Sequence, residues 1–234
     1  MEAAGDSGAG GSGFTMSRLK RALTGLGGPN PQDEGETRHL LALDGAGARL
    51  RLFQTDLLDL TYVRPAIEGA RGVFHLASPL ILQTRDPEAM LHALHYVLFQ
   101  CKELLEPAVK GTLNVLRAAK DCGVARVVLV SSKVAMVPNP NWPADKAIDD
   151  DSWADVELLN KLQYWYGISK TLAEKAAWNF AEQEGLQLVV LNPGVVLGPF
   201  LTPSVNASLL LFLRLLEGQQ KLPFTASPTC NLYA

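Results

Sequence analysis

The chain has 234 residues, of which 47% are hydrophobic and 19% are charged, and its formal net charge at pH 7 is -3. This composition excludes a disordered chain, which would be poorer in apolar residues and more highly charged. With 21 basic and 24 acidic residues, the sequence also lacks the positive charge of a nucleic-acid-binding protein. At roughly 150 residues per domain, the length predicts one large globular domain, or one domain and part of another.

Several features of the sequence indicate a cytoplasmic protein. Residues 1–13 are rich in Gly, Ala and Ser and contain acidic residues, unlike a signal peptide. The longest apolar runs, at 91–99 and 209–216, are shorter than the roughly 20 residues of a membrane span. The three cysteines form no CxxC pair, which predicts free thiols instead of a disulfide framework or a zinc site. We therefore expect no membrane partner, no nucleic-acid partner and no bound metal.

Residues 1–36 have the composition of a linker. Glycines interrupt this stretch repeatedly, and prolines and acidic residues follow them, around one short basic segment at 16–26. Such sequence favours turns and loops over packed elements. We predict a poorly ordered leader over residues 1–36.

After the leader, short runs rich in Val and Leu alternate with helical patterns. The strand candidates are 49–54, 72–77, 126–131 and 187–191. The helical stretches are 57–68, 103–122 and 155–183. Gly69 and Gly123 stand where helices are expected to stop. Because the strand candidates are continuous apolar runs, they suit strands buried on both faces, and the pattern predicts an α/β fold with a parallel sheet.

A tyrosine and a lysine four residues apart, Tyr166 and Lys170, lie in the last of these helical stretches. Side chains at i and i+4 share one face of a helix, about 5–6 Å apart at Cβ, so Lys170 can place a positive charge beside the Tyr166 hydroxyl. A tyrosine with an ordinary pKa of about 10 is a poor proton donor unless such a charge favours its phenolate. The pair is a candidate general acid, although many helices carry this spacing by chance.

Two serines strengthen that hypothesis. Ser131 and Ser132 follow the apolar strand candidate that ends at residue 130. Ligands of open α/β sheets bind at the carboxyl ends of the strands, where a serine can donate a hydrogen bond to a substrate carbonyl oxygen. The alternative is that the serine pair only caps the segment that follows.

A series of motifs carries a family resemblance. They are FQTDLLD at 53–59, GVFHLASP at 72–79, EPAVKGTLNVL at 106–116, VSS at 130–132, DDDSW at 149–153, YGISK at 166–170, NPGVVLGP at 192–199 and PSVNAS at 203–208. Together they span about residues 30–218 in order. The chain resembles an extended short-chain dehydrogenase/reductase of the NAD-dependent epimerase/dehydratase superfamily, in the plant branch of cinnamoyl-CoA reductase-like and dihydroflavonol reductase-like proteins.

The resemblance implies a fold, a cofactor and a reaction. The fold would be a Rossmann-like, doubly wound parallel sheet, and the cofactor NADP, with NAD as an alternative. Hydride would pass from the reduced nicotinamide to the carbonyl carbon of a small phenylpropanoid, flavonoid or related substrate. Tyr166 would be the proton donor, Lys170 would lower its pKa and hold the nicotinamide ribose, and Ser132 would polarise the carbonyl.

The resemblance also implies a set of cofactor contacts besides Tyr166 and Lys170. The adenine would meet Asp56 and Leu57, at the end of the first motif. The other cofactor contacts that it implies are Leu76, Ala77, Ser78, Pro193, Gly194, Val195, Val196 and Ser208.

The glycine-rich phosphate turn of the family is not found where it is expected. The glycines at 25–28 follow no apolar strand, and prolines stand where a helix should open, so they do not form the strand, turn and helix that a pyrophosphate needs. At the positions that face the 2′-phosphate in relatives, this chain has Pro29 and Glu36. A carboxylate there would repel the phosphate and weaken binding of the phosphorylated cofactor.

These departures define the expected organisation. We expect a leader over 1–36, an incomplete cofactor domain over 37–200 without the first βαβ unit, and the start of a truncated substrate domain over 201–234. Without the first two strands, the strand at 49–54 could not pair with that at 72–77 as in relatives, and a sheet edge would be open. The leucines at 209–216 are interpreted as a core helix without its cover, in preference to a membrane-surface stripe.

The segment 89–101 has the character of an apolar insertion. His92 and His95 within it could in principle bind a metal, but no third ligand is placed to help. A helical extension, or an intron translated as protein, is the favoured interpretation.

Two alternatives to the reductase stay open. The first is a truncated or impaired product that keeps the active-site helix and binds no dinucleotide. The second is another activity of the same fold, namely a sugar-nucleotide epimerase or dehydratase or a steroid dehydrogenase, although the motifs at 149–153 and 192–199 resemble the plant reductases more.

Overall fold

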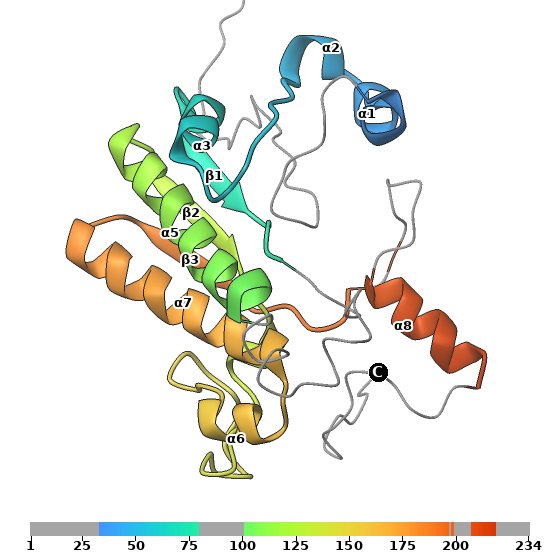
Figure 1. Ribbon diagram of the computed structural model, residues 1–234, viewed down its shortest axis with the longest axis vertical. Coiled ribbons are helices and arrows are strands. Elements are labelled where there is room, and N and C mark those ends of the chain that lie inside the picture. Colours follow the sequence, from blue (N-terminus) through green and yellow to red (C-terminus); the bar gives the residue numbers. More distant parts are fainter. Residues whose placement is uncertain (1–32, 80–100, 197, 199–206, 219–234) are drawn as a thin grey trace, which may run out of the picture.

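The computed structural model describes residues 33–79, 101–196, 198 and 207–218 (Figure 1). Its centre is a parallel sheet of three strands in the order β1-β2-β3: β1 (Gly72–His75), β2 (Arg126–Val130) and β3 (Leu188–Leu191). Residue 72 pairs with residue 126, and residue 127 with residue 188, so all three strands end at the same edge of the sheet. The predicted α/β fold with a parallel sheet is confirmed.

The strand predicted at 49–54 is wrong. Residue 49 closes the short helix α2 (Ala46–Arg49), and residues 50–54 form neither helix nor strand. In the described part of the chain the sheet consists of β1, β2 and β3, and residues 49–54 pair with none of them. A strand needs a partner strand for its backbone hydrogen bonds, so the local apolar pattern alone cannot make this run a strand.

Helices α3 (Leu60–Ile67) and α5 (Glu106–Asp121) follow the predicted stretches at 57–68 and 103–122. Helix α3 begins where the Asp59 carboxylate accepts a hydrogen bond from the Thr61 amide at 2.8 Å, as a helix N-cap does. A π-helical turn, η2 (Cys101–Leu105), precedes α5. Gly69 and Gly123 follow these helices with positive φ of 69° and 66°, as predicted for helix stops.

The single helix predicted at 155–183 is two helices, α6 (Val156–Lys161) and α7 (Trp165–Glu184). The chain turns between them at Gln163, which has a positive φ of 53°. Gly167 lets the two helices approach, because a Cβ at this position would lie 3.0 Å from Tyr164 Cδ1 and 3.1 Å from Leu159 Cδ2. The turn places the start of α7, with Tyr166, beside the end of β2.

Helices α3, α5 and α7 cover one face of the sheet, and α5 and α7 lie side by side (Figure 1). The core between the helices and the sheet is built from Leu57, Val63, Ile67, Val115, Leu116, Val127, Leu129, Ala177 and Leu186, among others. Burying one such Leu or Val side chain stabilises a fold by about 1.5–3 kcal/mol. Packing in this core determines where α7 lies on the sheet and which of its side chains face β2.

The opposite face of the sheet differs from the prediction of strands buried on both faces. Phe74 on β1 and Val189 and Leu191 on β3 are 50%, 40% and 49% exposed. Their neighbours in sequence, which point to the helices, are packed in the core. Buried and exposed side chains therefore alternate along the outer strands, because the described helices that pack on the sheet all lie on one of its faces.

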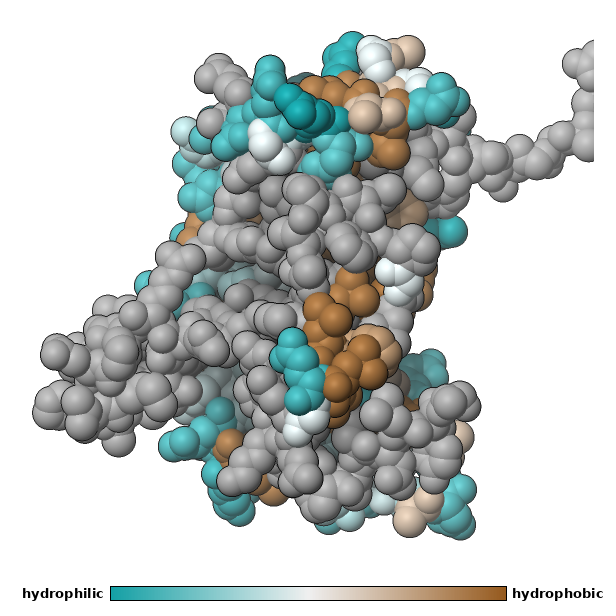
Figure 2. Space-filling model, turned by 90° about the vertical axis from the view of Figure 1, so that its right-hand side faces the viewer, coloured by the Kyte–Doolittle hydropathy of each residue, from teal (hydrophilic) through white to brown (hydrophobic). Residues whose placement is uncertain are grey.

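The remaining helices are α1 (Glu34–Leu41) and α8 (Ala207–Leu216), at the two ends of the described chain. Residues 34–36, which the sequence analysis assigned to the leader, belong to α1, and the rest of the leader lies outside the described residues apart from residue 33. Helix α8 exposes Phe212, Leu213, Leu215 and Leu216. Figure 2 views the molecule from the side on which α8 lies in Figure 1 and shows a hydrophobic patch at the centre of that face.

Two further expectations concern residues whose structure is not described. The apolar insertion at 89–101, with His92 and His95, lies outside the described residues except for residue 101, and so does Pro29. Within the described ranges, no helix has both the length and the apolar character needed to cross a membrane.

Candidate active site

The ends of the three parallel strands bring the predicted site residues to one edge of the sheet. Leu76, Ala77 and Ser78 follow β1, Ser131 and Ser132 follow β2, and residues 192–196 follow β3. The backbone continues to pair beyond the strands: the Ser131 amide donates to Leu191 O at 2.8 Å, and the Lys133 amide to Pro193 O at 3.0 Å. These bonds hold the loops after β2 and β3 together at the edge where α/β proteins bind ligands.

Ser132 has two structural relationships at this edge. Its hydroxyl oxygen accepts a hydrogen bond from the Val134 amide at 3.4 Å, which caps the short 3-10 helix η3 (Lys133–Ala135). It also forms a side-chain hydrogen bond with Tyr166. The capping role considered from the sequence is therefore present, and the same side chain reaches the predicted proton donor.

Tyr166 and Lys170 lie one turn apart in the first half of α7, as the spacing predicted. The Lys170 Nζ is 5.8 Å from the centre of the Tyr166 ring. Ser132, Tyr166 and Lys170 thus come together at the carboxyl edge of the sheet, from two elements separated by more than thirty residues.

The pKa of Tyr166 is raised above its usual value, because burial disfavours the phenolate, while the hydrogen bond with Ser132 acts in the opposite direction. From the sequence, the charge of Lys170 is expected to lower this pKa. In the structure the largest effect is burial, which acts in the opposite direction, and the Lys170 ammonium lies 5.8 Å from the ring centre. Tyr166 therefore keeps its proton at neutral pH, as a proton donor must before the transfer.

Lys170 is 7% exposed, and burial lowers its pKa to about 8, while the charge of Glu174 acts to raise it. At this pKa roughly nine tenths of the lysine is charged at pH 7. His75, at the end of β1, is buried, and burial with the charge of Lys170 lowers its pKa to about 4. His75 is therefore neutral at pH 7, and its Nε2 lies 3.3 Å from the Thr112 hydroxyl.

The predicted adenine contacts occupy the loop before α3. Asp56 is exposed, and its carboxylate accepts a hydrogen bond from the Leu58 amide at 2.9 Å. Leu57 is buried: its carbonyl accepts a hydrogen bond from Asn114 Nδ2 at 2.8 Å, and its Cβ packs against Gly111, where an added Cβ would lie 3.1 Å away. Helix α5 therefore fixes this loop, and the Asp56 carboxylate is accessible.

The other predicted cofactor contacts line the same edge with different exposures. Leu76 is 54% exposed and Ala77 is buried, so a ligand lying on this edge would meet the first side chain and the backbone of the second. After β3, Val195 and Val196 are 46% and 59% exposed. Ser78 and Pro193 are half-buried and Gly194 is exposed. Ser208 lies in α8, and its side chain is outside the described part of the structure.

Sequence reasoning missed the role of two polar residues behind the site, Glu174 and Asn192. Glu174 is only 6% exposed and accepts a hydrogen bond from Asn192 Nδ2 at 2.8 Å. The same amide nitrogen donates to the carbonyl of Ser132 at 3.1 Å. The i, i+4 spacing from Lys170 to Glu174 was the available signal, because it predicts a charge pair on one face of a helix.

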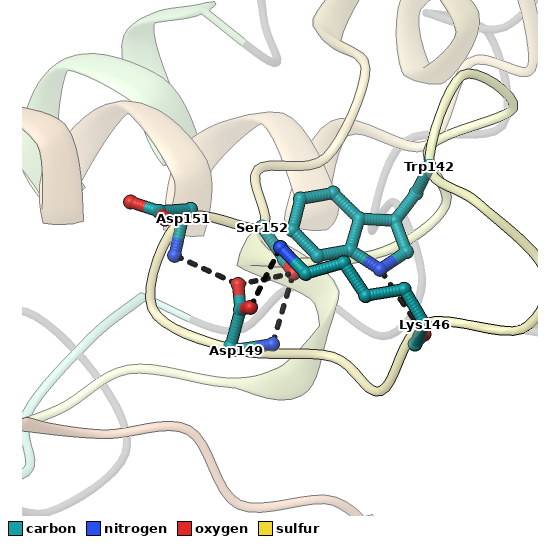
Figure 3. Close-up of polar contacts among 5 residues, drawn as sticks. All are labelled: Trp142, Lys146, Asp149, Asp151 and Ser152. Carbon is teal, nitrogen blue, oxygen red and sulfur yellow. Dashed lines mark hydrogen bonds and ion pairs between the residues drawn. The ribbon is translucent and has the colours of Figure 1, made fainter.

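The chain makes an excursion between η3 and α6, after Ser132, and Figure 3 shows the contacts that fold it. The Lys146 ammonium lies 2.8 Å from the Asp149 carboxylate and 4.1 Å from the centre of the Trp142 ring. The Trp142 indole donates to the carbonyl of Lys146 at 3.2 Å, and the Asp149 amide donates to the Ser152 hydroxyl at 3.0 Å. The hydrogen bond with Lys146 is the main cause that lowers the pKa of Asp149.

The described residues fit the nicotinamide end of a dinucleotide. The Ser131 hydroxyl is buried at the strand edge without a hydrogen-bond partner, and Tyr166 and Lys170 supply further donors one turn apart on α7. The glycines at 25–28, which bear on the phosphate end, lie outside the described residues. At neutral pH Tyr166 is protonated and Lys170 is mostly charged, so the described edge offers a proton and a positive charge to a ligand.

The parallel sheet and the Ser, Tyr and Lys at its carboxyl edge define a protein of the short-chain dehydrogenase/reductase class. A family model described as the NAD dependent epimerase/dehydratase family matches residues 9–227, and the chain belongs to this family. The family and the class predicted from the sequence motifs are confirmed.

Curated relatives agree with this assignment. The chain is 39% identical over 223 residues to a protein named cinnamoyl-CoA reductase CAD2 from Medicago truncatula, covering 92% of this chain and 64% of that one. It is 39% identical over 191 residues to tetraketide alpha-pyrone reductase 1 from Arabidopsis thaliana, covering 81% of this chain and 55% of that protein. The chain thus spans less than two thirds of the length of these relatives.

Solved structures show the same fold. Vestitone reductase from alfalfa superposes with a TM-score of 0.63 and 29% identity, covering 85% of this chain and 55% of that one. Gre2 from Candida albicans, in complex with NADPH, superposes with a TM-score of 0.53 and 30% identity, covering 69% and 48% of the two chains. The Rossmann-like fold is therefore shared with a structure that holds the phosphorylated dinucleotide.

Proposed function

We propose that this protein is an NADP-dependent oxidoreductase that reduces the carbonyl group of a small phenylpropanoid, flavonoid or related molecule. The observation that carries the proposal is the convergence of Ser132, Tyr166 and Lys170 at the carboxyl edge of the sheet. The relatives named as reductases of cinnamoyl-CoA and of tetraketide alpha-pyrones support the substrate class, and the NADPH complex of Gre2 supports the cofactor. NAD is the alternative cofactor.

Each residue of the set has a defined task in the proposed reaction. When bound, the reduced nicotinamide supplies the hydride that reaches the carbonyl carbon. The Ser132 hydroxyl donates a hydrogen bond to the carbonyl oxygen, and Tyr166 donates its proton to the same oxygen as negative charge develops there. Lys170 holds positive charge behind the tyrosine, which stabilises the phenolate left after the transfer. Proton donation of this kind accelerates a reaction by about 10²–10⁴-fold.

The cofactor would lie along the edge formed by the strand ends. Its nicotinamide end would contact Lys170, Tyr166 and residues 193–196, and Leu76, Ala77 and Ser78 would contact the middle of the cofactor. Asp56 and Leu57 would meet the adenine, and Ser208 would add a contact from α8. The exposed Asp56 carboxylate and the accessible Val195 and Val196 support these positions.

A tyrosine pair provides a matched test. The Tyr166→Phe variant removes the proton donor, and we expect its rate of NADPH oxidation with a hydroxycinnamoyl thioester or dihydroflavonol to fall by about 100-fold or more. Tyr164→Phe is the control, since its ring lies 6.4 Å from that of Tyr166 and it is half-buried as well. Equal rates in Tyr166→Phe and the parent chain would exclude Tyr166 as the donor.

A second candidate function is a chain that keeps the catalytic edge but does not bind a dinucleotide. The motive for this alternative is in the sequence, where the glycines at 25–28 follow no apolar strand and prolines stand where a helix should open. Titration with NADPH, followed by the fluorescence of the nicotinamide, separates the two. Micromolar binding supports the reductase, and no binding at millimolar NADPH supports the second candidate.

A further inference from the structure

Behind the catalytic set lies a buried carboxylate that the proposed reaction does not use. Glu174 is 6% exposed, one turn further along α7 than Lys170. A carboxylate withdrawn from water is costly unless a positive charge or hydrogen-bond donors compensate it. The Asn192 amide donates to Glu174 Oε2 at 2.8 Å, and Lys170 stands four residues earlier on the same helix, so that its positive charge acts on the carboxylate.

The second hydrogen bond of Asn192 connects Glu174 to the catalytic serine. Asn192 Nδ2 also donates to the carbonyl of Ser132 at 3.1 Å, so one amide group bridges α7 and the turn after β2. Asn192 itself directly follows β3. The Asn192 amide and the buried Glu174 carboxylate therefore join α7, the turn after β2 and the end of β3.

We propose that Glu174 is the positioning residue of this site, holding the ammonium of Lys170 charged and, through Asn192, holding the Ser132 turn against α7. The inference rests on the proposed function for its catalytic consequence, but the charge coupling itself does not require a cofactor. Glu174 touches neither of the reacting groups proposed above, and it acts through Lys170 and Ser132.

The charges around Lys170 explain why the carboxylate is needed. Tyr166 and Glu174 face Lys170 from its own helix, and His75 faces it from β1. Burial lowers the pKa of Lys170 to about 8, and Glu174 is the group that opposes this shift. His75 is neutral at pH 7 because its own pKa is about 4, so it adds no positive charge. Without Glu174, the lysine would lose charge near neutral pH.

A charge-removing variant with a matched control tests the coupling. Glu174→Gln keeps an oxygen that can accept the Asn192 hydrogen bond and removes the charge, and Glu182→Gln makes the same change at an exposed position of α7. The pKa of Lys170 is measured in the full chain by NMR titration of isotope-labelled lysine side chains, with Lys170→Arg to assign the signal. We expect a fall of about 1 unit in Glu174→Gln and no change in Glu182→Gln.

The activity of the same variants separates positioning from folding. In Glu174→Gln, kcat for carbonyl reduction should fall at pH 7.5 and recover toward the parent value at pH 6, where Lys170 is charged again, while KM for the carbonyl stays the same. A general loss of structure would not recover on acidification. If the parent chain neither binds NADPH nor reduces carbonyls, the proposed function fails, and the NMR titration still decides on the role of Glu174.

A double-mutant cycle covers the case in which Glu174→Gln is too unstable to titrate. If the two charges are coupled, the double variant Lys170→Met with Glu174→Gln loses less stability than the sum of the two single changes in urea unfolding. Additive losses, or an unchanged pKa of Lys170 in a folded Glu174→Gln chain, would overturn the proposal.

Discussion

The ammonium of Lys170 lies 5.8 Å from the centre of the Tyr166 ring, one turn away on helix α7. Both side chains are largely withdrawn from water, and burial raises the pKa of Tyr166 and lowers that of Lys170. A phenolate left at Tyr166 after proton donation would therefore form beside the ammonium of Lys170, which would stabilise it.

The first prediction concerns this charge. Lys170→Met keeps much of the apolar volume of the lysine stem but removes the ammonium, so the phenolate that follows proton donation loses its stabilising charge. We expect the rate of NADPH-dependent carbonyl reduction to fall by about 100-fold. Steady-state kinetics at pH 7 measure the effect, with the exposed Lys161→Met on α6 as the control. A rate within twofold of the parent would contradict the prediction.

The second prediction concerns the buried histidine at the end of β1. Its pKa is about 4 in the folded chain against 6.5 for the ordinary group, because burial and the charge of Lys170 disfavour the imidazolium. Between pH 6.5 and 4 the unfolded chain binds a proton that the folded chain does not, so His75 lowers stability as the pH falls through this window. The loss reaches about 3 kcal/mol at the acid end.

The measurement is urea unfolding of the parent chain and of His75→Gln at pH 7.5 and at pH 4.5. Glutamine does not titrate and can still bond the Thr112 hydroxyl, so the variant should lose less stability on acidification than the parent. Carboxylates with a lowered pKa, such as Asp59, also stabilise the fold less in acid, but this loss is the same in both chains. Parallel losses in the two chains would show that His75 is not the group responsible.

The third prediction concerns the contact of α6 with α7. Gly167→Ala places a Cβ 3.0 Å from Tyr164 Cδ1 and 3.1 Å from Leu159 Cδ2, and Leu159 is fully buried. Overpacking of this kind costs about 1–3 kcal/mol. Thermal unfolding measures the loss, and Gly47→Ala in α2 is the control, since no atom lies within 4 Å of its added Cβ. The control should be neutral or slightly stabilised, because alanine favours a helix more than glycine does.

The sheet and the placement of Tyr166 and Lys170 one turn apart on a helix could be predicted from the sequence because their signals are local. The strands at 72–77, 126–131 and 187–191 are apolar runs between helices, and the Tyr166 and Lys170 spacing is a property of one helix. The run at 49–54 has the same local character, yet it forms no strand, because a strand depends on a partner that the run does not specify. The local sequence pattern therefore identifies candidate strands, but it does not show which of them pair in the sheet.

The link between Glu174 and Asn192 could not be predicted in the same way. The two residues are 18 positions apart, on a helix and after a strand, and their contact depends on how α7 is rotated against β3. That rotation follows from core packing and from the turn at Gln163, neither of which leaves a clear mark in the sequence. The motif that contains Asn192 identified the segment but not what its side chain contacts.

The last prediction concerns the excursion between β2 and α6. Trp142 covers the Lys146 ammonium at 4.1 Å and donates its indole N–H to the Lys146 carbonyl, so the backbone at Lys146 is held on both sides (Figure 3). Trp142→Ala removes both contacts. The exposed ion pair with Asp149 remains, but exposed pairs contribute only about 0–1 kcal/mol and cannot hold the segment alone.

We therefore expect trypsin to cleave after Lys146 several-fold faster in Trp142→Ala than in the parent chain, with little change in the global unfolding temperature. Mass spectrometry of a timed digest identifies the cleavage site. Trp178→Ala is the control, because Trp178 is 40% exposed on α7, outside this segment. Cleavage after Lys146 at the parent rate in Trp142→Ala would mean that the indole does not fix the excursion, and that the backbone bonds which join it to η3 and α6, such as that from the Ala154 amide to Ala135 O at 2.9 Å, are sufficient.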